Sequence, residues 1–180
     1  MDIYTGQFYS DIHSTVCFSG YRPEKFSFSL EEENSGFLDL RENIETALIE
    51  TLKQGYRTYL CGMAKGFDLL CGKILLEIME RNKKTDARLI AVIPHKNHDF
   101  SDEWGQLHRQ LRAAAVGEVI ISHEYAKKNY LLRNRFMVEN SSCLVCYWDG
   151  QKGGTAQTVR LAKRQGHAIH NLARQAIGLS

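Results

Sequence analysis

Short apolar runs and longer amphipathic stretches alternate along the whole chain. The apolar runs are bounded by glycine, proline or charged residues, which is typical of strands buried on both faces of a parallel sheet. They predict strands at residues 15–19, 58–61, 88–93, 118–121, 143–148 and 167–172.

Between these runs, apolar residues recur at the spacing of one helical face. Helices are predicted at about residues 37–52, 67–78, 102–115 and 130–139, and a last one from Thr155. Thr155 is the expected N-cap of that last helix, and Gly55 and Gly166 stand where C-terminal cap glycines belong.

Strands that alternate with helices imply right-handed crossovers and a doubly wound α/β fold, with a mostly parallel sheet and helices on both of its faces. The chain has 180 residues, of which 43% are hydrophobic, and this suits one compact domain. We therefore expect a flexible N-terminal segment at residues 1–13 and a single domain at residues 14–180.

The charge balance narrows the classes of partner. With 23 Lys and Arg against 21 Asp and Glu, the net charge of +2 is too small for a broad nucleic-acid surface. Acidic residues gather early in the chain, whereas none follows Asp149. Local basic surface is therefore still expected.

The expected location is the cytoplasm. No window approaches the roughly 18 apolar residues of a membrane span, and the N-terminus lacks the pattern of a signal peptide. Five cysteines without a secretory signal favour reduced thiols. No membrane partner is expected, and the oligomeric state stays open, a homo-oligomer included.

Candidate chemistry gathers in the loops that follow the predicted strands. Ligands of open α/β sheets bind outside the carboxyl ends of the strands, where helix N-termini point. The loops are Gly20-Tyr21-Arg22 after the first strand, the segment 62–68 after the second, His95 after the third, and Asp149 to Thr155 after the fifth.

The loop 62–68 is the most informative of these. Gly62 and Gly66 allow a tight turn and a close approach to a ligand, Lys65 adds positive charge, and Asp68 could cap the next helix or bind a ribose or a base. The alternative is that the glycines only form the turn and Lys65 is solvated.

Gly153-Gly154-Thr155 is a second glycine-rich turn into a helix. Two such loops on one sheet edge favour a phosphate-bearing ligand, because each supplies N–H donors to an anion. Arg22, beside the stiff Pro23, is a candidate clamp for that anion, with an unliganded surface arginine as the alternative.

The aromatic, histidine and cysteine residues give weaker evidence for a site than the loops do. Tyr21 and Trp104 could stack on a base, although core or rim positions are the alternative. His95, His98, His108 and His123 lack a convergent third ligand, so we expect solvated loop histidines and no metal. Cys143 and Cys146 fall within a strand, where residues three apart face opposite sides, and are expected in the core.

Four motifs in order resemble the SLOG superfamily of Rossmann-like domains, and especially its small bacterial YpsA-like members. They are Gly20-Tyr21-Arg22, the segment 62–68, Arg133-Asn134-Arg135 and the run from Thr158 to Gly166. More distantly, the same motifs resemble the Rossmann domain of DNA-processing protein A. The resemblance implies a ligand pocket at the selected loops, joined by Asn134 and by either Arg133 or Arg135.

Two departures from these relatives matter. Gly72 stands where DNA-processing protein A has a histidine, which weakens the case for DNA binding. Thr158 stands where related phosphoribohydrolases have their catalytic glutamate, which argues against hydrolysis by their mechanism.

The leading hypothesis is binding or sensing of a nucleotide or nucleotide-derived phosphorylated ligand, such as an ADP-ribose-like molecule. One alternative is a nucleoside-phosphate or glycosyl hydrolase that uses Asp68 or Asp149, and a second is a single-stranded nucleic-acid module. The residues alone identify no reaction. The predicted ligand-binding set is Gly20, Tyr21, Arg22, Gly62, Lys65, Gly66, Asp68, His95, Trp104, Asn134, Arg135, Asp149, Gly153, Gly154 and Thr155.

Overall fold

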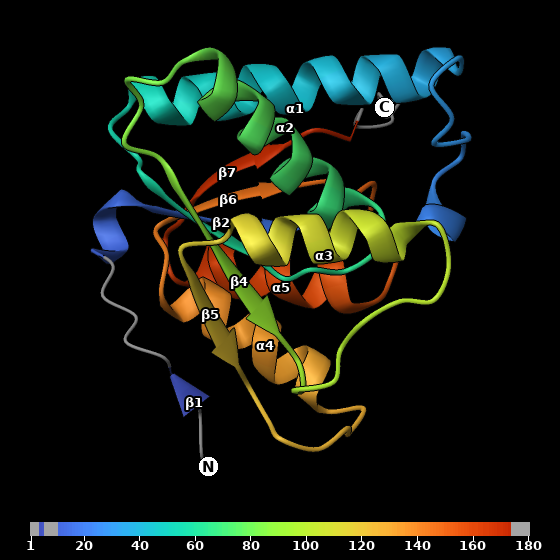
Figure 1. Ribbon diagram of the computed structural model, residues 1–180, viewed down its shortest axis with the longest axis vertical. Helices are drawn as coiled ribbons and strands as arrows, with labels where there is room; N and C mark the ends of the chain where they lie inside the picture. The colour runs from blue at the N-terminus through green and yellow to red at the C-terminus, as the bar shows by residue number, and fades with distance from the viewer. Residues whose placement is uncertain (1–3, 6–10, 174–180) are drawn as a thin grey trace, which may run out of the picture.

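The computed structural model describes residues 4–5 and 11–173 (Figure 1). Strands are β1 (Tyr4–Thr5), β2 (Thr15–Ser19), β3 (Thr58–Cys61), β4 (Arg88–Ile93), β5 (Gly117–Ile120), β6 (Cys143–Cys146) and β7 (Ala168–Asn171). Helices are α1 (Ser35–Lys53), α2 (Phe67–Arg81), α3 (Trp104–Ala114), α4 (Asn129–Glu139) and α5 (Gly154–Arg164), with short 3-10 turns at Ile12–Ser14 and Pro23–Lys25.

The seven strands form one sheet in the order β1-β5-β4-β3-β2-β6-β7. All neighbours pair in parallel except β1, which pairs antiparallel with β5. Successive strands step outward from β2 to β5, and the chain then returns to place β6 on the other side of β2. This is the predicted doubly wound α/β fold, and its order reverses between β2 and β6.

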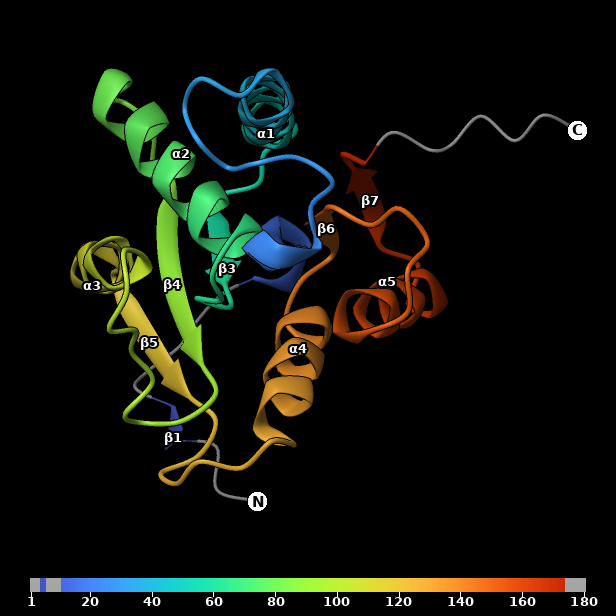
Figure 2. The ribbon, with the colours of Figure 1, turned by 90° about the vertical axis from the view of Figure 1, so that its right-hand side faces the viewer.

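Helices cover both faces of the sheet (Figure 2). One core cluster joins α1, α2 and α3 to residues such as Val16 and Phe18, and the other joins α4 and α5 to Cys17 and Leu144. Neighbouring residues of a strand thus face opposite layers. The central strands are buried along their whole length, which explains why they are continuous apolar runs.

The C-terminal glycines predicted for α1 and α5 follow these helices, but the predicted N-cap of α5 is wrong. Asn34 caps α1 by accepting from the amides of Gly36 and Phe37, and Gly55 follows the helix with φ of 98°. Thr155 is not the N-cap of α5. Gly153 takes that position with φ of 146°, and the Thr155 hydroxyl, inside the helix, donates to the Gly20 carbonyl oxygen at 3.1 Å.

Three strands differ from the prediction at their boundaries. The fourth predicted strand lies one residue earlier, at Gly117–Ile120, the fifth ends two residues earlier, at Cys146, and the last is one residue shorter at each end, at Ala168–Asn171. The Tyr147 amide still donates to the Ser19 carbonyl oxygen at 3.2 Å, and at the next residue the Asn171 side chain accepts from the Trp148 amide at 3.0 Å. A side-chain hydrogen bond thus takes over from the ladder at Trp148.

The predicted N-terminal segment 1–13 falls partly outside the described residues. Within it, Tyr4–Thr5 form strand β1 on β5, and Asp11 caps the 3-10 turn at Ile12–Ser14. No helix of the described residues is long and apolar enough to cross a membrane.

All five cysteines are buried free thiols. Cys143 belongs to the cluster under α1 and α2, and Cys146 to the cluster under α4 and α5, as the pleat of a strand requires. Burial raises the pKa of both thiols to about 12, so they remain protonated at neutral pH.

Two leucines of α1 test the importance of its inner face. Leu48 is fully buried and Leu38 is 50% exposed on the same helix. We expect Leu48→Ala to lower the free energy of unfolding by about 2–5 kcal/mol, because it leaves a cavity. Leu38→Ala should change it by less than about 0.5 kcal/mol. Urea unfolding measures both, and equal losses would contradict the assigned orientation of α1.

Candidate functional site

A cavity of about 200 Å³ opens at the carboxyl edge of the sheet, where the strand order reverses. Ser19 and Cys146, the last residues of β2 and β6, pair side by side there. Such a reversal leaves a crevice between loops that diverge to opposite faces. The lining residues are Ser19, Gly20, Tyr21, Arg22, Glu24, Lys25, Ala64, Asp68, Tyr130, Leu131, Arg133, Asn134, Gly154 and Thr155.

Close backbone approaches bring the first two loops together. A Cβ on Gly20 would lie 2.3 Å from the Phe67 ring, and a Cβ on Gly66 would lie 2.5 Å from the Tyr21 carbonyl oxygen. Gly66 also has φ of 85°, which favours glycine. The Phe67 amide donates to the Tyr21 carbonyl oxygen at 3.1 Å, so the start of α2 is fixed against the loop after β2.

Arg133 joins α4 to the loop after β3. Its side chain is buried, with Nη1 donating to the Gly62 carbonyl oxygen at 2.7 Å, and Nε and Nη2 donating to Asn134 Oδ1 at 3.1 and 2.9 Å. These contacts settle which arginine of the Arg133-Asn134-Arg135 motif faces inward. They also orient the Asn134 side-chain amide, because its Oδ1 accepts both hydrogen bonds from Arg133.

Asp68 is the buried carboxyl of the cavity. It lies in the first turn of α2 with 3% exposure, and a Cβ on Gly62 would come within 2.7 Å of Asp68 Oδ2. Burial raises the pKa of Asp68 to about 6, although the Arg133 charge and the amides of Ala64 and Gly20 oppose the shift. Gly62 thus leaves room for both the Asp68 carboxyl and the Arg133 guanidinium.

The N-terminus of α5 forms another wall. Gly154 and Thr155 lie in its first turn, where amides have no acceptor within the helix and the helix dipole is positive. Thr158 Oγ1 donates to the Gly154 carbonyl oxygen at 3.0 Å, so this hydroxyl is committed to the helix. This wall is suited to an anion.

Cationic and aromatic groups surround the entrance. The guanidinium carbons of Arg22 and Arg133 lie 5.8 and 5.6 Å from the centre of the Tyr130 ring. Arg22 is exposed and has no carboxylate partner within the described part of the chain. Three cations and two acids line the cavity, and one of the acids is Asp68 with its raised pKa.

Several predicted residues do not line the cavity. Lys65 forms an ion pair with Asp102 above the Phe100 ring, and Arg135 pairs with Glu139 at 2.6 Å. Each of these cations is neutralised by a carboxylate near it in the fold. The Trp104 side chain packs against the core.

Three more of the predicted residues lie outside the cavity lining: Asp149, His95 and Gly153. Asp149 accepts a hydrogen bond from the Tyr21 hydroxyl and is absent from the cavity lining, so of the two carboxyls considered for hydrolysis only Asp68 lines it. His95 is a neighbour of Tyr130, with 6.5 Å between the ring centres, and does not line the cavity. Gly153 is the N-cap of α5, and a Cβ there would lie 2.9 Å from Lys25 Nζ.

Two of the histidines expected to be solvated are buried. His98 Nδ1 lies 3.2 Å from His108 Nε2, and His108 Nδ1 lies 3.4 Å from Asp99 Oδ1. Burial lowers the pKa of His98 to about 3, so it is neutral. Within the described ranges, no group of three or more His, Cys, Asp or Glu side chains converges to hold a metal.

A groove of about 380 Å³ between α4 and α5 shares Leu131, Asn134 and Gly154 with the cavity. Arg135 lines this groove, beside its pairing with Glu139, and Arg164 lies farther along α5. The two hollows therefore adjoin at the start of α5, and a ligand longer than a phosphosugar has space to continue.

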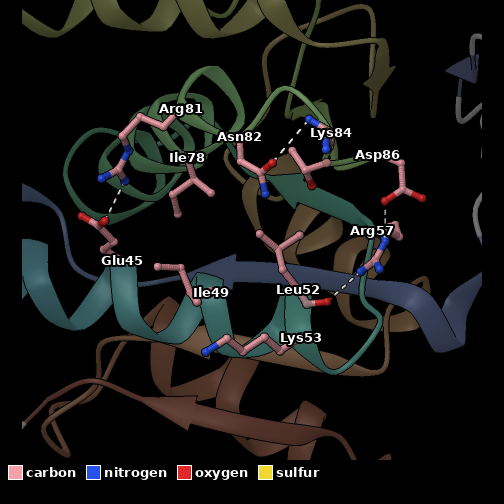
Figure 3. Close-up of a pocket in the computed structure, with 11 residues that line it drawn as sticks. Glu45, Ile49, Leu52, Lys53, Arg57, Ile78, Arg81, Asn82, Lys84 and Asp86 are labelled. Atoms are coloured by element: carbon pink, nitrogen blue, oxygen red, sulfur yellow. Dashed lines mark hydrogen bonds and ion pairs between the residues drawn. The ribbon is translucent and has the colours of Figure 1, made fainter.

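A larger cavity of about 540 Å³ lies at the opposite edge, between the ends of α1 and α2 (Figure 3). Four of its six charged side chains pair with each other: Arg81 with Glu45 at 2.6 Å and Arg57 with Asp86 at 2.5 Å. Helix C-termini also repel anions. This cavity lacks the features that suit the carboxyl-edge cavity to phosphate.

Comparison with known families decides the relationship. The family model YpsA, described as the YspA SLOG family, matches residues 16–178. The chain belongs to this SLOG family. Its loops 20–22 and 62–68 and its 133–135 motif, which carried the resemblance, all contribute residues to or around the cavity. A comparison with curated proteins found no match.

Two solved structures share the fold of this SLOG domain. DNA processing protein A from Helicobacter pylori, whose structure is described for its single-stranded DNA binding mode, has 18% identity and a TM-score of 0.57 over 86% of this chain. The Streptococcus pneumoniae protein has 16% identity and a TM-score of 0.58 over 87%. The chain spans 63% and 49% of the length of these two proteins. At 16–18% identity, the likeness shows the Rossmann-like fold alone.

Two residues that line the cavity, Tyr130 and Lys25, were not among the predicted site residues. Tyr130 is the second residue of α4, and Lys25 lies in the 3-10 turn after the first loop. The apolar spacing of α4 is irregular because Asn129 and Arg133 occupy buried positions, so helical periodicity could not show which face was inward. Position in the first turn of a helix at the carboxyl edge was the available indication for Tyr130.

The raised pKa of Asp68 gives a direct test. In the folded protein its carboxyl should be half protonated near pH 6, and Asp102, whose pKa the Lys65 hydrogen bond lowers, should stay ionised there. Because an unfolded aspartate has a pKa of about 3.9, stability from protonated Asp68 is present below about pH 4 and is lost as pH rises through 6. Carboxyl-carbon NMR titration measures both groups, and an Asp68 midpoint below pH 4 would contradict dominance by burial.

Proposed function

We propose that the carboxyl-edge cavity binds the phosphate and sugar of a nucleotide or nucleotide-derived ligand, such as an ADP-ribose-like molecule. One observation carries the proposal: the N-terminus of α5, the unpaired Arg22 guanidinium and the Asn134 amide line one cavity at the reversal of strand order. Helix amides and a guanidinium are complementary to phosphate oxygens. The buried Asp68 carboxyl and the Asn134 amide supply groups for sugar hydroxyls or for a base.

The size of the cavity agrees with this ligand class. About 200 Å³ is below the roughly 300–1,000 Å³ of sites for drug-sized ligands. The cavity therefore suits a phosphosugar, and the rest of a larger ligand would extend into the adjoining groove or outward past Tyr130.

Removing one of two cations tests the proposal. Arg22→Ala should weaken binding of ADP-ribose or adenosine monophosphate by roughly 10- to 100-fold, because hydrogen bonds to a charged group contribute about 1.5–3 kcal/mol. Lys65→Ala removes the same charge from a residue already paired with Asp102, and should change the Kd by less than about threefold. Isothermal titration calorimetry in 0.1 M salt measures both variants.

Two results would overturn the proposal. The first is that the unmodified protein shows no saturable binding of these nucleotides or of ribose 5-phosphate up to millimolar concentration. The second is that Arg22→Ala and Lys65→Ala weaken binding equally, which would place the anion elsewhere.

A second candidate function is binding of single-stranded nucleic acid. It is favoured by the two guanidinium groups around Tyr130, because single-strand sites combine cations with aromatic stacking. The single-stranded DNA binding described for the Helicobacter pylori protein, which shares the fold, supports the same candidate function. The near-neutral net charge of +2 limits any such site to a local patch.

Salt dependence tests this second function. The affinity for a 12-residue oligothymidylate, measured by fluorescence anisotropy, should fall linearly with salt on logarithmic axes. Arg22→Ala should reduce the slope by about 0.7, the value for one phosphate contact to a single strand. Absence of binding at low salt would reject this function and leave the small-ligand proposal intact.

A further inference from the structure

An exposed aromatic residue stands beside the mouth of the cavity. Tyr125, in the loop between β5 and α4, is 68% exposed. The other exposed large hydrophobic residues of the described chain are Ile12, Leu38, Val116 and Leu131, and of these Leu131 lines the cavity itself. Single exposed apolar residues are common on protein surfaces, so the case for Tyr125 depends on its neighbours at the cavity.

Tyr125 belongs to a group of rings that begins at the wall of the cavity. The centre of its ring lies 6.4 Å from that of Tyr130 and 5.3 Å from that of His95, and the His95 and Tyr130 centres are 6.5 Å apart. All three pairs are steeply inclined, at 70–83°. The rings therefore meet edge to face, and Tyr125 keeps much of its surface open to solvent.

The three residues come from the loops that follow β4 and β5 and from the start of α4. His95 follows β4 after Pro94, and Tyr130 is fixed in the first turn of α4. The Lys96 amide donates to the Ser122 carbonyl oxygen at 3.0 Å, which joins the loop after β4 to the loop after β5. Tyr125 is thus presented by a braced loop.

We propose that Tyr125 and His95 form a nucleobase subsite that continues the phosphate cavity outward past Tyr130. This inference rests on the proposed function, because the base belongs to the nucleotide whose phosphate meets Arg22 and the start of α5. The sugar of that nucleotide would lie against Tyr130, between the two ends.

The chemistry of the rings suits a base better than an aliphatic group. Aromatic side chains stack on the π-face of any base, and the imidazole nitrogens of His95 can donate to or accept from the base edge. Desolvation lowers the pKa of His95, which keeps the ring neutral and able to do either. The exposed cations Lys127 and Lys128, close in sequence, add a field that attracts an anionic nucleotide.

The decisive experiment compares two ligands that differ by the base. Calorimetry of the full chain with adenosine monophosphate and with ribose 5-phosphate should show tighter binding of the nucleotide. Tyr125→Ala should weaken adenosine monophosphate by at least about fivefold, since stacking on one aromatic contributes about 1–3 kcal/mol. It should leave the affinity for ribose 5-phosphate unchanged within twofold, and Tyr125→Phe should retain nucleotide binding.

Val116→Ala is the matched control, because Val116 has the same 68% exposure but lies just before β5, at the opposite edge. A second readout uses the fluorescent nucleotide 2-aminopurine riboside monophosphate. Stacking should quench its emission in the unmodified protein and in Val116→Ala, and Tyr125→Ala should restore the emission.

The outcomes separate this inference from the proposed function. If ribose 5-phosphate binds and Tyr125→Ala leaves nucleotide affinity and quenching unchanged, the subsite is wrong and the phosphate cavity stands. If neither ligand binds the unmodified protein, the proposed function fails and the subsite fails with it. Loss of both ligands in Tyr125→Ala would likewise overturn the inference, because it would show a general effect on the cavity.

Discussion

The site depends on one buried charge, the guanidinium of Arg133. A buried cation is tolerated only when its hydrogen-bond donors are satisfied and a negative group lies near. Here the Gly62 carbonyl oxygen, the Asn134 side chain and the Asp68 carboxyl meet those needs. The Gly62 carbonyl oxygen belongs to the loop after β3 and Arg133 belongs to α4, so this hydrogen bond fixes two walls of the cavity relative to each other, with the Asp68 carboxyl of α2 close by.

The same arrangement explains the composition of the glycine-rich loops. At Gly62 a side chain would collide with the Asp68 carboxyl, and at Gly66 it would collide with the loop after β2. These glycines are required by close contacts within the protein, and neither of them lines the cavity. Packing within the protein therefore accounts for the glycines of the loop 62–68.

The fold could be predicted because its strands are continuous apolar runs and because Gly55 and Gly166 mark the ends of two helices. The edge of the sheet that carries the cavity followed from the topology. Individual side chains were harder to predict, because their partners are distant in sequence. Lys65 is drawn to Asp102, and the inward position of Arg133 depends on a carbonyl oxygen 71 residues away. The spacing of apolar and polar residues within one element does not indicate such contacts.

The order of strands has a consequence for the synthesis of the chain. β2 is made early, yet one of its two neighbours is β6, whose Cys143 pairs with Val16. Until β6 and α5 have left the ribosome, β2 is an unprotected edge and the wall of the cavity that α5 forms does not exist. The carboxyl-edge cavity is therefore complete only when the last fifth of the chain has folded.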